Sequence, residues 1–150
     1  MEEKNTAQSN TILPLDKEAA TPALIAHAGT NARFAYHEFF DADISNPHTR
    51  RSYRHAVQRL LRWCERRGIP LRQLTPWHVG DYLRQMTRWD GGASSKPTQK
   101  LHLAAIRRFL DRLVLRHAIP LNPAASVRGP RHSVIEGRTP ALDVMQARRL

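Results

Sequence analysis

The sequence predicts an all-α fold, a compact bundle of four to five helices. Apolar residues recur at the spacing of a helix face in several segments, and a proline lies near the expected start of each of the longest helices. No segment of useful length alternates apolar and polar residues with the period of a β-strand, and no internal repeat is present. With 150 residues, of which 41% are hydrophobic, the chain can form one domain with a small core.

The first expected helices are short. A helical turn is predicted over residues 21–29, where Thr-Pro can start it and Gly can end it. A longer helix is predicted at about residues 31–41, with phenylalanines available to the core. Asp41 and Asp43 lie near the end of this helix, where a negative charge opposes the helix dipole.

The next helix is predicted from Asn46 to Gly68. Asn can cap its start, Pro suits its first turn, and Gly can end it. Seven arginines and a single acid, Glu65, share this segment with a stripe of apolar residues, Tyr53, Val57, Leu60, Leu61 and Cys64. Trp63 in this helix and Trp77 in the following one flank apolar faces, and we expect both in the core.

Two more helices complete the predicted bundle. One begins at Thr75-Pro76 and runs to about residue 88, with an inner face of Val79, Tyr82, Leu83 and Met86. The last runs from about residue 96 to 116 with the stripe Leu103, Ile106, Phe109, Leu110, Leu113 and Val114. Four prolines within residues 119–140 then predict an extended, tethered segment, after which Asp143 is expected to cap a further helix.

The charge of the chain is unevenly distributed. The whole sequence has 24 Lys+Arg against 13 Asp+Glu, a net charge of +11, but residues 47–138 alone hold 19 basic and five acidic residues, a net charge of +14. A small domain with this charge repels itself unless an anionic partner offsets it. Only four of the 24 cations are lysines, and arginine forks phosphates and guanine edges in a way that lysine does not. Nucleic acid is therefore the first candidate, ahead of an acidic membrane surface or an acidic protein.

Two of the expected helices carry basic residues beside their apolar stripes, so that a duplex groove would meet both. The first basic flank consists of Arg50, Arg51, Arg54, Arg62 and Arg66. The second consists of Lys96, Lys100, Arg107 and Arg108. Hydroxyl groups near the helix starts could add phosphate contacts, namely Thr49, Ser95 and Thr98. The alternative is the solvated surface of a merely basic protein, and the scarcity of interleaved acids argues against it.

Several function classes find no support in the sequence. No apolar run is long enough to span a membrane, and the polar, acidic N-terminus does not resemble a signal peptide. The single cysteine, Cys64, fits a reducing compartment, so we expect a cytoplasmic protein. His48 and Arg51 with Tyr82 suggest a phosphoryl-transfer site, but Tyr82 belongs to an apolar face and is expected in the core. The sequence thus predicts no catalytic residue, no metal site, no cofactor and no small-molecule substrate.

The order and spacing of several short motifs resemble the core-binding domain of the tyrosine recombinases, the phage integrase family. The resemblance covers residues 44–150 and includes segments 45–83 and 94–132. Its first half rests on Thr49, Arg50, Tyr53, Trp63-Cys64 and Thr75-Pro76. Its second half rests on Ser95, Thr98, Leu103, Ile106-Arg107, Phe109, Asn122-Pro123-Ala124 and Arg128.

The resemblance implies a SAM-like helical domain that clasps one face of double-stranded DNA, while a separate catalytic domain takes the opposite face. It implies that Thr49, Arg50, Arg54, Lys96, Thr98, Lys100 and Arg107 lie at the DNA, and that Arg128 and Arg131 follow the phosphates in the linker. The expected organisation is a disordered tail (1–22), a DNA-binding domain (23–126), a basic linker (127–140) and the truncated start of a catalytic domain (141–150). The catalytic residues of the family would then be absent from this chain. Other recombinase protomers are the expected partners on DNA.

Two other functions remain open at this point. A stand-alone helical DNA-binding regulator would also be basic, although the proline-containing connection between the helices at 46–68 and 75–88 is longer than a helix-turn-helix turn. An interaction module for acidic partners would bind polyanions without preferring a duplex.

Overall fold

The computed structural model describes residues 20–87 and 90–130, and predictions about residues 1–19, 88–89 and 131–150, including Arg131 and the helix after Asp143, lie outside this part of the chain. The described residues contain no β-strand, so the all-α prediction is confirmed, with one isolated β-bridge between Thr87 and Ala93. The α-helices are α2 (Ala23–His27), α3 (Thr30–Glu38), α4 (Pro47–Arg66), α5 (Pro76–Gln85) and α6 (Lys96–Leu115). A π-helical turn (Phe39–Asp43) follows α3, and a 3-10 turn (Leu71–Gln73) precedes α5.

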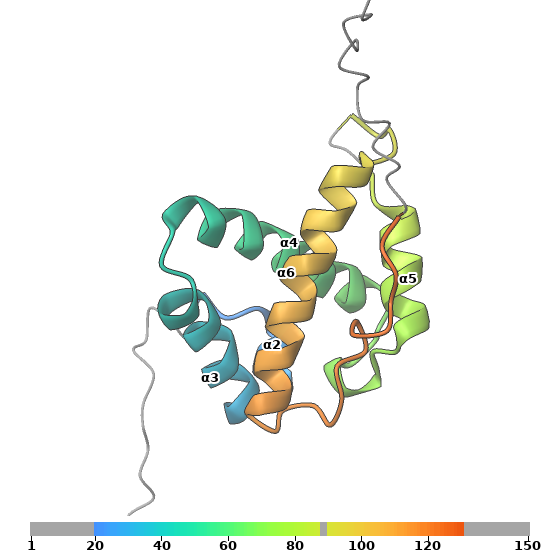
Figure 1. Cartoon of the computed structure of the whole chain (residues 1–150). Coiled ribbons are helices and arrows are strands. Elements are labelled where there is room, and N and C mark those ends of the chain that lie inside the picture. Colours follow the sequence, from blue (N-terminus) through green and yellow to red (C-terminus); the bar gives the residue numbers. More distant parts are fainter. Residues whose placement is uncertain (1–19, 88–89, 131–150) are drawn as a thin grey trace, which may run out of the picture.

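The bundle is organised around the two longest helices. α6 crosses α4 and packs directly against it, while α3 lies against α6 on one side and α5 lies on the other (Figure 1). The core between them is aromatic at its centre, where Phe109 of α6 meets the rings of Tyr36, Phe39 and Phe40 edge-on or stacked. All four rings are at most 1% exposed. The apolar stripes that the sequence predicts on these helices therefore face one another.

Each long helix begins where a side chain can accept hydrogen bonds from its free N–H groups. Asn46 Oδ1 accepts from the backbone N–H groups of His48 and Thr49 at the start of α4. Thr75 and His78 cap α5 reciprocally, since each side chain accepts from the other's backbone N–H. Ser95 Oγ accepts from Thr98 N–H at the start of α6. A proline occupies the first turn of all three helices, as the sequence predicts.

Acidic residues form ion pairs with arginines on the side of the bundle where α3 meets the end of α6. Asp43, which the sequence places unfavourably at a helix end, accepts a hydrogen bond of 2.7 Å from Arg112 Nε. Glu38 accepts one of 2.9 Å from Arg116 Nε. The ion pair with Arg112 therefore offsets the unfavourable interaction of Asp43 with the helix dipole. Because the two residues are 69 positions apart, no local pattern reveals this pair.

The single acid of α4 has a structural role. Glu65 Oε1 accepts a hydrogen bond of 3.1 Å from the backbone N–H of Leu24, in the first turn of α2. α2 has no side-chain cap of its own, because Pro22 stands at its N-cap position. Glu65 thus supplies the missing acceptor from a neighbouring helix and fixes α2 on the bundle.

The segment after α6 folds back along the bundle instead of forming another helix (Figure 1). Arg107 of α6 donates from Nε to the carbonyl of Ala124 at 3.1 Å and from its Nη2 to the carbonyl of Val127. Asn122 Nδ2 donates to the Arg107 carbonyl at 3.0 Å and to Asp111 Oδ1 at 2.6 Å. These bonds hold residues 122–127 on the surface of α6, so the chain runs back toward the end of the bundle at which α6 begins.

The tryptophans divide between core and surface. Trp63 is 7% exposed and lies in the core as predicted, with its ring edge-on to Tyr82. Trp77, however, is 65% exposed, and the expectation that it lies in the core is wrong. It stands in the first turn of α5, ahead of Val79, the first residue of that helix to face inward.

Cys64 and Tyr82 are buried as predicted, and burial raises the pKa of the Cys64 thiol to about 12. No described helix is long and apolar enough to cross a membrane.

Candidate nucleic-acid interface

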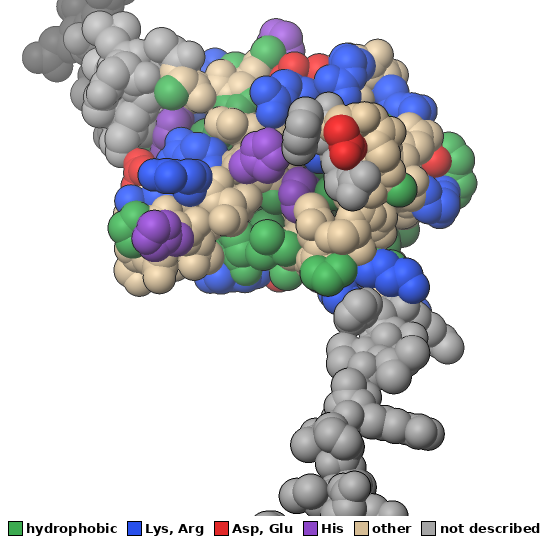
Figure 2. Space-filling view, turned by 90° about the horizontal axis from the view of Figure 1, so that it is seen from above, with side chains coloured by type: hydrophobic (Ala, Val, Ile, Leu, Met, Phe, Trp, Pro, Cys, Tyr) green, Lys and Arg blue, Asp and Glu red, His purple; other side chains and the backbone are tan. Residues whose placement is uncertain are grey.

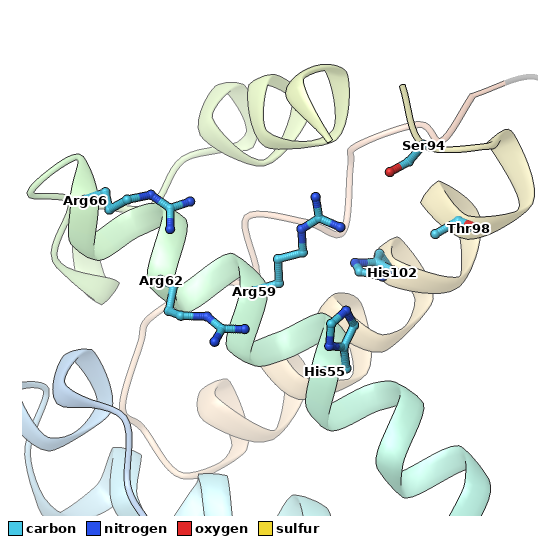
Figure 3. Close-up of a pocket in the computed structure, with 7 residues that line it drawn as sticks. All are labelled: His55, Arg59, Arg62, Arg66, Ser94, Thr98 and His102. Carbon is cyan, nitrogen blue, oxygen red and sulfur yellow. The ribbon is translucent and has the colours of Figure 1, made fainter. Parts of the chain in front are cut away.

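A surface hollow of about 750 Å³ lies between α4 and the start of α6. Figure 3 shows arginine side chains projecting from α4 toward the first turns of α6, with two histidine rings beside them. The residues that line it are His55, Arg59, Arg62, Arg66, Ser94, Thr98 and His102. No carboxylate belongs to this set, so the described lining of the hollow has positive charge and hydrogen-bond donors with no acid to offset them.

Four of these side chains, with Arg51, form one stripe along α4. Arg51, His55, Arg59, Arg62 and Arg66 follow one another at steps of four, four, three and four residues. At 100° per residue they lie within about 80° of one another around the helix, and the stripe is ~22 Å long. The buried residues of α4 occupy the opposite side of the helix. We call these five residues the α4 basic stripe.

The arginines that the sequence analysis groups into one basic flank of α4 do not all lie on the α4 basic stripe. Arg50 lies outside the stripe by its angle around the helix, and its Nη2 donates at 2.7 Å to the carbonyl of Ile44. Arg54 also lies off it, with its guanidinium 4.6 Å from the centre of the Phe40 ring. Arg62 and Arg66 line the hollow instead. The arginines of the first basic flank therefore lie on two different surfaces of α4.

Most other arginines of the bundle have partners within the domain. Arg112 and Arg116 pair with Asp43 and Glu38, as described above. Asp81 lies 3.7 Å from an Nη of Arg67 and 3.5 Å from an Nη of Arg84. For Arg62 and Arg66, by contrast, the described part of the chain supplies no carboxylate within ion-pair distance. These two guanidinium groups are available to an external anion.

Arg59 differs from its neighbours on the stripe. Its Nη2 donates to the backbone carbonyl of Thr87, in the segment that leads from α5 to α6. Ser94 N–H in turn donates to the carbonyl of Met86 at 3.0 Å, across the isolated bridge. Arg59 therefore holds the wall of the hollow in place.

The buried histidine of the hollow, His102, is an uncharged donor or acceptor rather than a cation. His102 is 4% exposed, its ring meets that of His55 edge-on at 5.9 Å, and its Nδ1 lies 3.4 Å from the Tyr82 hydroxyl. Burial, reinforced by the positive charge of Arg59, lowers the pKa of His102 to about 4. The His102 ring is therefore neutral at physiological pH, and the positive charge of the hollow comes from arginine.

The other residues predicted to contact DNA lie in several places. Thr98 lines the hollow, and its hydroxyl lies 2.8 Å from that of Ser95. Lys96 and Lys100 are in the first turns of α6, and Thr49 is in the first turn of α4. Arg108 lies over the Tyr53 ring at 5.6 Å, and Arg128 is exposed in the segment after α6.

Arg107 stands apart from these candidates. Its Nε and Nη2 are engaged with backbone carbonyls of the segment that follows α6. The structure thus gives Arg107 an internal role that no local sequence pattern indicates, because the partners lie 17 and 20 residues away. Contact of the predicted residues with DNA stays a prediction.

Four lining residues, His55, Arg59, Ser94 and His102, were not among the candidates from sequence. The signal that could have found two of them is the helical spacing from Arg51 to Arg66, which places His55 and Arg59 between arginines on one face. His102 had no such signal, because it interrupts an otherwise apolar inner face of α6.

Figure 2 looks onto the end of the bundle at which α6 begins. Lysine and arginine side chains are spread over this face, histidines lie between them, and fewer acidic side chains are visible. Among the described residues, no group of three or more His, Cys, Asp or Glu side chains is placed to hold a metal ion. The arrangement is suited to bind an extended polyanion by direct contact.

Comparisons with known proteins agree with the helical architecture. Residues 36–117 match the family model described as phage integrase, N-terminal SAM-like domain. This range extends from α3 to the end of α6 and covers more than half of the chain. No curated protein and no solved structure matches the chain. On the extent of the family match and the all-α bundle that carries it, the chain belongs to the phage integrase N-terminal SAM-like domain family.

Proposed function

We propose that this chain is the duplex-DNA-binding domain of a site-specific recombinase of the tyrosine type. In this proposal, residues 23–126 form the body that contacts DNA and residues 127–140 form a basic linker. The chemistry of strand cleavage and joining belongs to a separate catalytic domain, and further protomers share the recombination site. Membership of the integrase family supports the proposal, and so does the distribution of charge over the bundle.

The observation that carries the proposal is the arginine-lined hollow between α4 and α6. The acids Glu38, Asp43 and Asp81 pair with arginines elsewhere on the bundle. Like charges gathered in the hollow without a counter-ion repel one another, and an anionic ligand offsets this cost. Guanidinium groups bind phosphate oxygens in two-point fashion, so the backbone of a nucleic acid is the ligand that best matches them.

The shape of the basic surface favours a duplex over a compact anion. The α4 basic stripe is ~22 Å long, which is more than half of one turn of B-form DNA. The start of α6, with Lys96 and Lys100, lies beside the hollow at the same end of the bundle. A single phosphate or a short acidic peptide would engage part of this surface, whereas a duplex backbone can follow its length.

A salt titration of DNA binding tests the proposal. Fluorescence anisotropy would measure the affinity of the chain for a labelled duplex, for the matching single strand and for heparin over a series of salt concentrations. We expect the logarithm of the duplex affinity to fall linearly with the logarithm of salt concentration, by about 0.9 for each phosphate contacted. We also expect the duplex to bind more tightly than the single strand.

Two outcomes would contradict the proposal. A duplex affinity that hardly changes with salt would mean that the basic surface does not meet phosphates. Equal affinity for heparin and for the duplex would instead favour an interaction module for acidic partners, because such a module recognises charge density and not the spacing of a double helix.

A further inference from the structure

We propose that residues 12–15, Ile-Leu-Pro-Leu, bind an apolar groove at the end of the bundle opposite the start of α6. The groove has a volume of about 500 Å³ and lies between the 3-10 turn that precedes α5 and the segment that follows α6. Figure 1 shows both segments at the end of the bundle where α6 finishes. Docking there would hold the N-terminal segment of the chain away from the arginine-lined hollow, which goes beyond the proposed DNA-binding function.

The surface of the groove is apolar. Leu71, Leu74 and Ile119 are buried and form its floor. Pro120 and Leu121 are exposed at its rim, and Leu121 is 77% exposed. A large leucine exposed beside an apolar floor indicates a surface that another apolar segment covers.

The groove is already shaped in the folded chain. Arg72 Nε donates at 3.2 Å to the carbonyl of Ala118, which ties the 3-10 turn to the segment after α6. Asn122 Nδ2 donates at 3.0 Å to the Arg107 carbonyl and fixes that segment on α6. Neither wall therefore needs to be ordered by a ligand, which lowers the cost of binding.

The sequence of the N-terminal segment matches the groove in polarity and charge. Residues 12–15 are the longest apolar run among residues 1–19, which are otherwise mostly polar. A residue that precedes proline favours an extended backbone, which would place Leu13 and Leu15 on the same side of the segment. Asp16 follows this run, and Arg72 is the single charged residue among the described residues that line the groove. No described carboxylate lies within ion-pair distance of Arg72, so its charge is available to Asp16.

The position of α2 allows the N-terminal segment to reach the groove. Leu24 of α2 lines a smaller hollow of about 180 Å³ together with Leu71 and Arg72, and these two residues also line the groove. Leu15 precedes Leu24 by nine positions, and an extended chain of nine residues spans about 30 Å. The groove therefore lies within reach of the apolar run of the same chain.

The residues after 130 are less well placed to reach the groove. Gly129 lies against Lys100 and Leu103 in the first half of α6, so the chain leaves the described bundle near the start of this helix (Figure 1). The groove lies at the other end of α6, which has 20 residues and is therefore ~30 Å long. Of the two terminal segments, the N-terminal one fits the position of the groove.

A spin label in the N-terminal segment tests the docking in the full chain without DNA. Ser9→Cys introduces the labelling site, and the native Cys64 is 1% exposed, so the nitroxide attaches to the introduced thiol. The measurement is the loss of amide NMR signal that a nearby nitroxide causes. It is read at Leu71, Leu74 and Leu121 of the groove and, for comparison, in the first turns of α6.

Matched variants of the spin-labelled chain show which residues the docking needs. Leu13→Ser, Leu15→Ser breaks the apolar run and leaves the label in place. Leu121→Asp puts a charge on the rim of the groove, whereas Leu115→Asp puts one at an exposed leucine of α6 that does not line the groove. A mixed sample of isotope-labelled chain without nitroxide and spin-labelled chain without isotope detects docking onto a second copy.

We expect signal loss at the groove in the spin-labelled chain and in its Leu115→Asp variant, and none in the first turns of α6. The loss should disappear in the double serine variant and in Leu121→Asp, because each removes one side of the apolar contact. A synthetic peptide of residues 8–19 should shift the groove amides of the double serine variant more than those of the unaltered chain. In the unaltered chain the tethered segment competes with the peptide at an effective concentration on the order of 1 mM.

Several outcomes would overturn the inference. Absence of signal loss at the groove in the spin-labelled chain does so, and so does a loss that survives in the double serine variant or that Leu115→Asp abolishes as well. Loss in the mixed sample would show that the groove takes the segment of a second copy, which rules out docking within one chain. Failure of the salt titration refutes the proposed function and leaves this inference standing, because none of these measurements involves DNA.

Discussion

Arg107→Ala tests the internal role that the structure gives to this arginine. The substitution removes the guanidinium group that donates to the carbonyls of Ala124 and Val127. Ala124 is fully buried, so its carbonyl loses a partner that water cannot readily replace. Val127 is only partly buried, and its carbonyl can recover a hydrogen bond from solvent. The change therefore acts on the segment that folds back along α6, and it leaves the helix itself intact.

The expected magnitude follows from these two bonds. A hydrogen bond from a charged donor contributes about 1.5–3 kcal/mol to stability, and a buried acceptor left without a partner costs a similar amount. Since only the Ala124 carbonyl stays buried, the free energy of unfolding should fall by about 2–3 kcal/mol. The bonds from Asn122 to the Arg107 carbonyl and Asp111 remain and set an upper limit on how far the segment loosens.

The assay is urea unfolding combined with amide hydrogen exchange. In Arg107→Ala, amides of residues 118–130 should exchange faster, while those at the centre of α4 and α6 should stay protected. The neighbouring substitution Arg108→Ala is the control, because Arg108 only lies over the ring of Tyr53 and should cost less than about 1 kcal/mol. If Arg107→Ala leaves both exchange and stability unchanged but weakens duplex binding by about 1–3 kcal/mol, Arg107 reads DNA as the sequence predicts, and the structural assignment is wrong.

Two further predictions concern the core and its buried histidine. Leu110→Ala should lower the free energy of unfolding by about 2–5 kcal/mol, because Leu110 of α6 is fully buried in the core and the substitution leaves a cavity. A loss below about 1 kcal/mol in urea unfolding would contradict the packing described. The pKa of His102 lies at about 4 in the folded chain against an ordinary 6.5, so the unfolded chain binds more protons between these values. The stability that the neutral ring confers is therefore present above the ordinary pKa and is lost as the pH falls toward 4, by about 3 kcal/mol in all. His102→Gln should lack this part of the pH dependence in urea unfolding at several pH values, and an unchanged dependence would show that other groups cause it.

The helices could be predicted from the sequence because their determinants are local. A capping side chain, a proline in the first turn and an apolar stripe at helical spacing all lie within the segment that they organise, and α4, α5 and α6 begin where these signals place them. The fold-back segment after α6 was likewise predicted not to be helical from its prolines. The prediction that Trp77 lies in the core was wrong. Trp77 is in the first turn of α5, and the inner face of this helix begins only at Val79.

The candidate site could be predicted only in part. The excess of arginine over acid in residues 47–138 is a property of the composition, and it indicates a polyanionic partner whatever the fold. The partners of these arginines could not be predicted. Helical spacing places Arg50 and Arg54 nearer the apolar stripe than Arg62 and Arg66, but it does not show that Arg50 donates to the Ile44 carbonyl or that Arg54 lies over the Phe40 ring. A helix position gives the direction in which an arginine leaves the backbone, but not the partner it finds.

By itself, then, the sequence determined that the chain is helical, where its long helices begin, which of their faces are apolar, and that the domain carries a positive charge in need of an anionic partner. The tertiary structure decided which cations are available to that partner. Arginine has a long side chain with several donors, so a carbonyl or carboxylate distant in sequence can engage it, as Ala124 engages Arg107 and Glu38 engages Arg116. Arg62 and Arg66 are left to an external ligand because the described part of the folded chain brings no acid near them.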